Sequence, residues 1–280
     1  MLTSTVVTLR AQKDGSLPLA MGEYGHAAFL SIVREVAPDL AQLLHDRDER
    51  KPFTVSPLQG RMQRRGRYVQ VKRDQQCWMR FTLLDPALYT IFSRYFAETT
   101  TFVLKIELGS IPFAIEEIIA TQDGHAWSGY TNFSDLWNGA GSAGEIPLRF
   151  HSLTAFSLGG TEGGTARFAL FPTPELVFES LCQQWNQFSD DKRFDVETLR
   201  QFVADQVIVK RHQVSSDLWY FRRYPQAGFT GYCVYGIVGN HPTETRQLNA
   251  LAKFTFYSGV GYHTTMGMGQ CRRMPPRKVW

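Results

Sequence analysis

The residues with the most unusual types and spacing form a glycine-rich run, Ser258-Gly-Val-Gly-Tyr-His-Thr-Thr-Met-Gly-Met-Gly-Gln270. Its glycines form two pairs that each flank one apolar residue, Gly259 with Gly261 and Gly267 with Gly269. Glycines at this density permit positive φ and let a backbone lie against a ligand, commonly a phosphate chain. The run lacks the Gly-Lys-Ser/Thr of a P-loop, and Thr264 occupies the place of the third glycine in a dinucleotide fingerprint. The spacing is equally consistent with a phosphate contact and with a tight loop packed on a helix.

Positive charge gathers in a second stretch, from Arg47 to Arg73. The whole chain carries +4, whereas this stretch has nine basic and two acidic residues, or +7, which leaves −3 for the rest. A local excess of this kind indicates an anion-binding face. Basic residues near the glycine run are mixed with aromatic ones, which suits nucleic acid because cations meet phosphates and rings stack on bases. The predicted contacts are Arg61, Arg64, Arg65, Arg67, Lys72, Arg73, Gly259, Gly261, His263, Gly267, Gly269, Arg272 and Arg273; Arg277 and later residues are interpreted as a solvated tail.

Several other kinds of active site are disfavoured by the sequence. His125, His151, His212 and His241 lack the H-x-H and HExxH spacings of zinc sites. We therefore predict no metal and no cofactor. The chain has no Gly-x-Ser-x-Gly elbow and no clustered carboxylates for two-metal phosphoryl transfer. Its four cysteines are scattered without a C-x-x-C pair, and we expect them to be reduced and mostly buried.

Composition indicates a folded chain. Of the 280 residues, 43% are hydrophobic and 20% are charged, close to the average for folded proteins, and the length suits one large or two ordinary domains. No stretch approaches the roughly 18 apolar residues of a spanning helix, and the N-terminus lacks the features of a signal peptide. We therefore predict a cytoplasmic protein without a membrane partner.

Hydrophobic periodicity gives the first half the order strand, helix, strand, strand, helix, strand, which is the ferredoxin-like order. Gly60 and Gly66 punctuate the basic stretch, which predicts a hairpin around Tyr68. The predicted strands are Ser4–Arg10, Phe53–Val55, Arg67–Val71, Cys77–Leu84 and Phe102–Leu108, and the predicted helices are Tyr24–Val36, a short piece ending near His45, and a helix from Asp85 to Ala97.

The second half has a similar order that is less clear. We predict strands at Leu148–Ser157, Thr165–Phe171, Leu218–Tyr224 and Gly228–Ile237, a Pro-Gln-Ala turn between the last two, a helix at Pro174–Phe188 capped by Thr173, a helix at Thr243–Phe256, and a final strand after Gly267. The glycine-rich segment Asn138–Gly144 is a natural linker between the halves. The predicted fold is α+β with two tandem ferredoxin-like (RRM-like) βαββαβ domains, residues 1–140 and 141–280.

The glycine run, after a helix and before the final strand, resembles that of the CRISPR-associated endoribonuclease family that trims precursor CRISPR RNA, the sixth Cas family. Three further segments are similar to this family: Phe150-His-Ser-Leu-Thr-Ala-Phe-Ser157 with the helix that ends in Trp185-Asn186, Ala37-Pro-Asp-Leu-Ala-Gln-Leu-Leu-His45, and Lys51-Pro-Phe-Thr-Val-Ser-Pro57. The resemblance touches both halves and implies the same two tandem ferredoxin-like domains.

The resemblance also implies a catalytic set. The family's histidine, in a loop after the first helix, falls on His45, and its lysine before a Phe-Thr strand falls on Lys51. Many members have a helper tyrosine on the first helix, where this chain has Leu30, which cannot move a proton. His26, one helical turn earlier, can serve instead, with Tyr24 as a weaker substitute.

The implied activity is a metal-independent endoribonuclease that cleaves the repeat of precursor CRISPR RNA. The substrate's own 2′-hydroxyl is the nucleophile, so the protein supplies an acid, a base and a cation. An alternative is a non-catalytic RNA-binding subunit of a CRISPR effector complex, which shares the fold and the glycine run. A third is a nucleotide-binding regulator that uses the run for a small phosphate ligand. The expected partners are the repeat RNA and other CRISPR effector subunits.

Overall fold

A computed structural model gives the architecture and describes residues 1–46, 50–98, 105–160, 166–190 and 192–275. Arg47, Arg277, the first part of the predicted strand Phe102–Leu108 and the start of Thr165–Phe171 lie outside the described residues. Among the helices described, none combines the length and the apolar character needed to cross a membrane. The four cysteines are buried free thiols, as the sequence predicts.

The chain divides into two compact units. The first comprises Met1–Thr131 together with two short segments from the other half, Trp219–Gln226 and Thr265–Gly267. The second comprises Asn132–Leu218, Ala227–Thr264 and the residues from Met268 onward.

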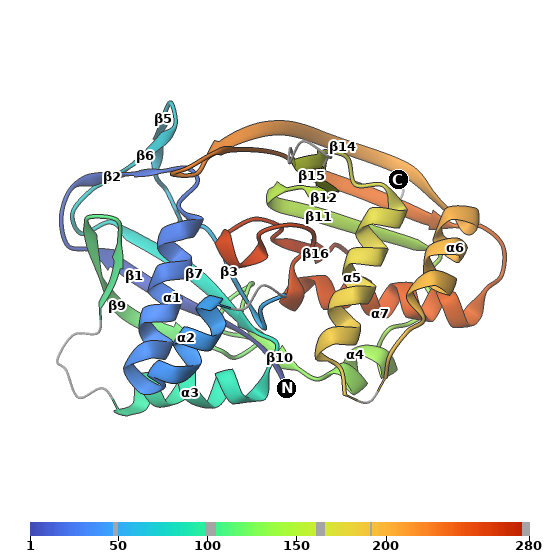
Figure 1. Ribbon diagram of the computed structural model, residues 1–280, viewed down its shortest axis with the longest axis horizontal. Coiled ribbons are helices and arrows are strands. Elements are labelled where there is room, and N and C mark those ends of the chain that lie inside the picture. Colours follow the sequence, from blue (N-terminus) through green and yellow to red (C-terminus); the bar gives the residue numbers. More distant parts are fainter. Residues whose placement is uncertain (47–49, 99–104, 161–165, 191, 276–280) are drawn as a thin grey trace. The chain divides into compact units, whose positions relative to one another are not determined.

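The first unit is built on an antiparallel sheet in the order β3-β7-β1-β9-β8, with β10 also paired to β1 and β4 to β7 (Figure 1). Without β4, β8 and β10, the remaining strands β3-β7-β1-β9 have the order 2-3-1-4 of a βαββαβ ferredoxin-like domain. Its elements are β1 (Leu2–Ala11), α1 (Gly22–Val36), α2 (Pro38–Asp46), β3 (Phe53–Val55), β4 (Gln59–Gly60), β7 (Gln76–Leu83), α3 (Pro86–Glu98), β8 (Lys105–Leu108), β9 (Ile111–Ile119) and β10 (Gly129–Thr131).

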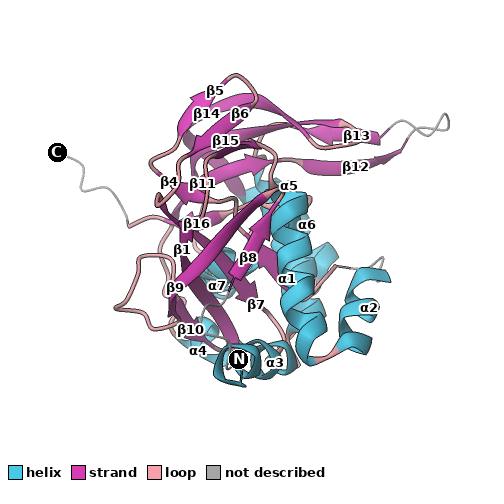
Figure 2. Ribbon diagram, turned by 90° about the vertical axis from the view of Figure 1, so that its left-hand side faces the viewer, coloured by secondary structure: helices cyan, strands magenta, loops and turns pink. Residues whose placement is uncertain are grey.

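Helices α1 and α3 pack together against one face of this sheet (Figure 2). The apolar stripe of α1, with Phe29, Ile32 and Val33, is buried against strand residues such as Phe53, whose ring stacks on that of Phe29 with centroids 4.0 Å apart. Pro38 disfavours continuation of the first helix and supplies the first residue of α2. His26 lies three residues before Phe29 and therefore on the same side of the helix, next to the core.

A smaller sheet carries the basic hairpin. It pairs β2 (Gly15–Pro18), β6 (Tyr68–Val71) and β5 (Gln63–Arg65) in the order β2-β6-β5, with Gly66 at a φ of +58° in the turn. This confirms the predicted hairpin around Tyr68.

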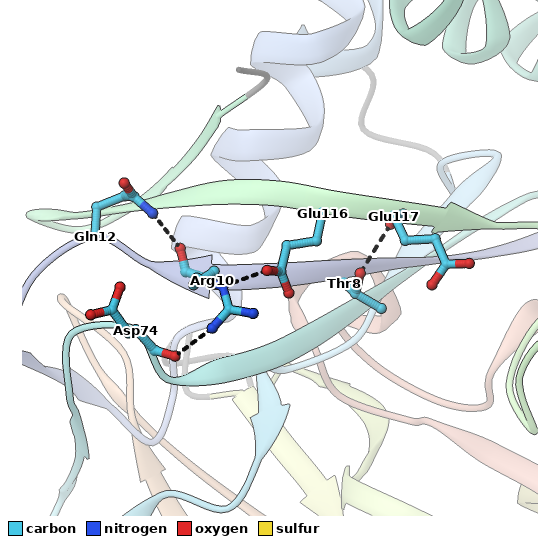
Figure 3. A network of polar contacts seen from close by, with 6 residues as sticks. All are labelled: Thr8, Arg10, Gln12, Asp74, Glu116 and Glu117. Atoms are coloured by element: carbon cyan, nitrogen blue, oxygen red, sulfur yellow. Dashed lines mark hydrogen bonds and ion pairs between the residues drawn. The ribbon is translucent and has the colours of Figure 1, made fainter. Parts of the chain in front are cut away.

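Polar contacts join β1, β9 and the turn between β6 and β7 at the base of this hairpin (Figure 3). The guanidinium of Arg10 forms an ion pair with Glu116 and donates a hydrogen bond to the carbonyl of Asp74 at 3.1 Å. Asp74 has a φ of +64°, a conformation that non-glycine residues rarely adopt, so these contacts hold a turn that is costly on its own.

The second unit repeats the fold with the sheet order β14-β15-β11-β16 (Figure 1). Its helices bury a core that includes Trp185, Phe178 and Phe254. Its elements are α4 (Phe133–Asn138), β11 (Glu145–Thr154), β12 (Phe156–Gly160), β13 (Ala166–Ala169), α5 (Pro174–Phe188), α6 (Val196–Gln206), β14 (Val207–Tyr220), β15 (Pro225–Ile237), α7 (Pro242–Ser258), the short 3-10 turn η1 (Thr264–Met266) and β16 (Cys271–Arg273). The fold class is therefore α+β with two tandem ferredoxin-like domains, as predicted.

The structure corrects three predictions in detail. The predicted Pro-Gln-Ala turn is wrong, because β15 already begins at Pro225 and the turn lies at residues 221–224. The strand beside β1 is β9, which the sequence analysis missed in favour of its hairpin partner β8. Thr173 precedes α5 as predicted, but its side chain makes no capping hydrogen bond.

Candidate functional site

The candidate site of the first unit comprises the predicted residues His26 on α1, His45 at the end of α2, and Lys51 just before β3. His26 lies on α1 at a half-buried position, with its ring centroid 5.5 Å from that of Phe53. Its electrostatic environment includes the charges of both Lys51 and His45. The structure therefore brings the three predicted catalytic residues into one cluster.

The hydrogen bond of His26 determines which ring nitrogen carries the proton. Its Nδ1 lies 3.2 Å from the carbonyl oxygen of Thr265, in the segment at the tip of the glycine run. A carbonyl oxygen only accepts hydrogen bonds, so the neutral ring must carry its proton on Nδ1 and leave Nε2 as an acceptor. Burial, together with the positive charge of Lys51, lowers the pKa of His26 to about 4. At neutral pH His26 is thus an uncharged imidazole whose Nε2 can accept a proton.

This lowered pKa predicts a pH dependence of stability. The unfolded chain takes up the His26 proton near pH 6.5, whereas the folded chain takes it up only near pH 4. The unfolded state therefore binds more protons in this window, and the free energy of unfolding falls as the pH is lowered through it. His26→Asn should make this fall smaller by about 2 to 3 kcal/mol, measured by urea unfolding at pH 7, 5.5 and 4.5. An unchanged pH dependence would show that His26 titrates normally.

His45 and Lys51 are joined through the end of α2. The ammonium of Lys51 donates hydrogen bonds to the carbonyls of Leu44 and His45, at 2.5 Å and 3.0 Å. These are carbonyls of the last helical turn, where a cation also meets the negative end of the helix dipole. Lys51 therefore positions His45, whose side chain is exposed to solvent. Their catalytic roles stay predictions.

The other two positions considered on α1 do not join this cluster. Leu30 is only 4% exposed and belongs to the hydrophobic core. Tyr24 packs against the core as well. It precedes His26 by two residues, or about 200° around a helix, so the two side chains leave α1 on different sides. His26 is therefore the stronger candidate for the second catalytic group.

The glycine run uses most of its amides within the protein. Gly259, Gly261 and Gly269 donate their N–H groups to the carbonyl of Thr255, the hydroxyl of Ser180 and the carbonyl of Leu153. Those three amides are therefore unavailable to a phosphate. A backbone contact with RNA phosphates, as predicted from the sequence, is then limited to the segment between Gly261 and Gly269. A Cβ on Gly261 or Gly269 would also lie within 2.4 Å of a backbone oxygen. For these glycines the structure favours the tight-loop interpretation.

Gly267 differs from the other three glycines. It belongs to the first unit, has a φ of +83°, and a Cβ there would make an ordinary contact with Pro57 at 3.4 Å. The neighbouring Met266 lies against α1, where a Cβ on Gly22 would come within 1.6 Å of its carbonyl oxygen. Gly22 is therefore a residue that the sequence analysis missed: only glycine permits this approach, and nothing in the local pattern indicates it.

The other predicted RNA contacts near the glycine run are His263, Arg272 and Arg273, which differ in their surroundings. His263 has a φ of +56° and its ring lies against that of Tyr262, with centroids 3.6 Å apart. Arg272 and Arg273 are half-buried on β16, and burial lowers the pKa of Arg273. Their contact with RNA stays a prediction.

Apart from Arg64, which donates a hydrogen bond to the carbonyl of Gly66 at 3.2 Å, the predicted basic residues of the hairpin and its base fall into two groups. Lys72 forms an ion pair with Asp14 at 3.0 Å, and Arg73 forms one with Asp74 at 3.8 Å. Arg61, Arg65 and Arg67 are exposed, and no acidic side chain pairs with them in the described part of the chain. The uncompensated positive charge of this surface therefore lies on the hairpin rather than at its base.

A metal-dependent mechanism would need a group of side chains that can bind the ion. Within residues 1–46, 50–98, 105–160, 166–190 and 192–275, no three His, Cys, Asp or Glu side chains gather as a metal site would require. The site can instead offer an imidazole base, a second imidazole and an ammonium group, which together suit acid-base catalysis.

Both halves of the sequence match models of one protein family. Residues 1–138 match the CRISPR Cas6 N-terminal domain, and residues 148–271 match the CRISPR-associated endoribonuclease Cas6. The chain belongs to the CRISPR-associated Cas6 family. This confirms the resemblance found in the sequence.

Individual Cas6 proteins are similar over nearly the whole chain. The CRISPR-associated endoribonuclease Cas6 of Streptococcus thermophilus is 18% identical over 238 residues, which cover 85% of this chain and 86% of that protein. A solved Cas6 product complex has a TM-score of 0.83 at 27% identity and covers 98% of this chain and 100% of its own. Thermus thermophilus Cas6 has a TM-score of 0.73 at 24% identity, with 98% of each chain covered, and supports the fold.

Proposed function

We propose that this Cas6-family chain is a metal-independent endoribonuclease that cleaves the repeat of precursor CRISPR RNA. The observation that carries the proposal is the cluster of His26, His45 and Lys51, in which His26 is held neutral with Nε2 as an acceptor. Such a cluster supplies what RNA transesterification requires, and it lies in a chain whose family is described as CRISPR-associated endoribonucleases. The solved Cas6 product complex that this chain resembles, and the endoribonuclease description of the family, support RNA as the substrate.

In the proposed reaction the nucleophile comes from the RNA. Nε2 of His26 removes the proton of the 2′-hydroxyl next to the scissile phosphate, and the oxygen attacks phosphorus. His45 protonates the departing 5′-oxygen, and the ammonium of Lys51 stabilises the negative charge of the phosphorane. The products are a 2′,3′-cyclic phosphate and a 5′-hydroxyl. We propose that residues 1–140 carry this catalysis and that residues 141–280 supply the glycine run.

Incubation of the protein with its repeat RNA in EDTA tests the proposal. We expect one cut per repeat, ends that carry a cyclic phosphate, and no cut when the nucleotide at the site is 2′-deoxy. Binding without cleavage would instead identify a non-catalytic RNA-binding subunit, and tight binding of ATP or GTP in preference to RNA would identify a nucleotide-binding regulator. Cleavage that stops in EDTA would contradict the metal-independent mechanism.

The two groups of basic residues, with and without acidic partners, predict different salt dependences. Replacing Arg61 and Arg65 with glutamine should weaken repeat binding and lower the slope of log K against log salt by roughly 0.7 to 0.9 for each lost phosphate contact. The matched control replaces Lys72 and Arg73, whose charges already have acidic partners, and should change the slope less. Binding titrations from 50 to 300 mM salt measure both. Equal slopes for wild type and Arg61→Gln/Arg65→Gln would place the RNA elsewhere.

A further inference from the structure

The turn between β14 and β15 carries two arginines that the sequence analysis left unassigned. Residues 221–224 read Phe-Arg-Arg-Tyr, and the side chains of Arg222 and Arg223 are exposed. In the part of the chain that the structure describes, neither guanidinium has an acidic partner. The segment Trp219–Gln226 belongs to the first compact unit, the one that holds the candidate catalytic cluster.

One contact joins this turn to the basic hairpin. The guanidinium of Arg67 lies over the ring of Tyr220, with 3.4 Å between its central carbon and the ring centroid. A cation over an aromatic face is attracted by the ring quadrupole, and Arg67 keeps its charge in this arrangement. The hairpin and the turn therefore form one surface, with uncompensated positive charge on Arg61, Arg65, Arg67, Arg222 and Arg223.

A second contact places the turn beside the catalytic helix. The backbone N–H of Arg222 donates a hydrogen bond to the carboxylate of Glu23 at 3.2 Å. Glu23 lies in the first turn of α1, three residues before His26. Residues three apart are neighbours on one helix face, separated by a rise of about 4.5 Å. Arg222 thus lies close to the group proposed to remove the 2′ proton.

The two anchors use the backbone and Tyr220, so the arginine side chains do not hold the turn in place. Glycines or small polar residues would close such a turn equally well. Two adjacent unpaired guanidinium groups repel each other, and their fork of N–H donors matches phosphate oxygens. The arrangement is therefore one that an anionic ligand stabilises.

We infer that Arg222 and Arg223 form a phosphate-binding site for the RNA backbone next to the scissile phosphate. The inference rests on the proposed function, because it takes the substrate of the His26 cluster as its ligand. The site would hold the strand so that the 2′-hydroxyl meets Nε2 of His26. Arg222 and Arg223 are thus positioning residues, which act on the geometry of the substrate and take no part in proton transfer.

The double variant Arg222→Gln/Arg223→Gln tests the inference. With a repeat RNA that is 2′-deoxy at the cut site, we expect binding to weaken about 10- to 100-fold and the salt slope to fall by about 0.7 to 0.9 per lost contact. Single-turnover cleavage at saturating protein should also slow, because the reacting groups are less well aligned. The matched control is Arg200→Gln/Arg211→Gln, two exposed arginines ion-paired with Glu197 and Glu145, which should behave as wild type.

Neutral phosphates in the substrate locate the contact. Methylphosphonate linkages are placed singly on either side of the cut. At one or two positions they should weaken binding by the wild-type protein. At the same positions they should have no further effect in the double variant, because the effects of two groups that contact each other are not additive. Full additivity at every position, or wild-type affinity and salt slope in the variant, would overturn the inference. Absence of cleavage by the wild-type protein would instead reject the proposed function. Failure of the inference and failure of the proposed function therefore give different results.

Discussion

Replacing His45 with alanine is expected to slow single-turnover cleavage of repeat RNA at least about a hundredfold, since a positioned acid or base contributes roughly 10²–10⁴-fold. The His45 side chain is exposed at the end of α2, so its removal leaves no cavity and no unsatisfied buried group. Affinity for the RNA should stay near the wild-type value, because proton transfer acts in the transition state. Rapid mixing with saturating protein, together with titration of a 2′-deoxy substrate, separates the two effects.

His241→Ala is the matched control for this variant. His241 lies before α7 and its ring packs against Phe202, in the second compact unit. Its removal should leave cleavage unchanged. If His45→Ala cleaves at the wild-type rate while His26→Asn does not, the mechanism has one imidazole and His45 is a surface residue.

Local sequence patterns predicted the elements that carry the site. The periodicity of α1 and the Pro38 break gave both helices nearly to their ends, and Gly66 gave the hairpin. These features depend on neighbours in the chain, which is why a single sequence contains them. The order of strands and helices then sufficed for the ferredoxin-like fold.

Features that depend on long-range contacts could not be predicted in this way. The neutral state of His26 requires its burial, and the choice of the protonated ring nitrogen depends on the carbonyl of Thr265, which is 239 residues away in the sequence. The ion pair of Lys72 with Asp14, which compensates a predicted RNA contact, forms only when β2 pairs with β6. The Arg222 turn was misplaced because Pro225 is typical of turns, although it is the first residue of β15, where its missing N–H is tolerated.

Gly22→Ala is expected to separate the tip of the glycine run from α1. An alanine Cβ would lie 1.6 Å from the carbonyl oxygen of Met266, a distance that no packing adjustment of a side chain can relieve. Alanine favours a helix over glycine by about 1 kcal/mol, so α1 should persist and residues 265–267 should move. Thr265 then leaves His26, and the ring becomes hydrated. Loss of the Thr265 hydrogen bond lowers the pKa of His26, but burial is the larger effect, so the pKa should rise from about 4 toward its ordinary value.

Two measurements follow this change in Gly22→Ala. NMR titration of the histidine ring protons reports the pKa of His26 without any RNA, and single-turnover cleavage should slow at least about tenfold because the imidazole is no longer held in one orientation. The control is Gly144→Ala, where a Cβ would meet nothing within 4 Å. A His26 pKa that stays near 4 with normal cleavage would mean that α1 and Met266 adapt to the added methyl group. A raised pKa with normal cleavage would show that the orientation of His26 does not limit the reaction, and would move the search for the base to another group.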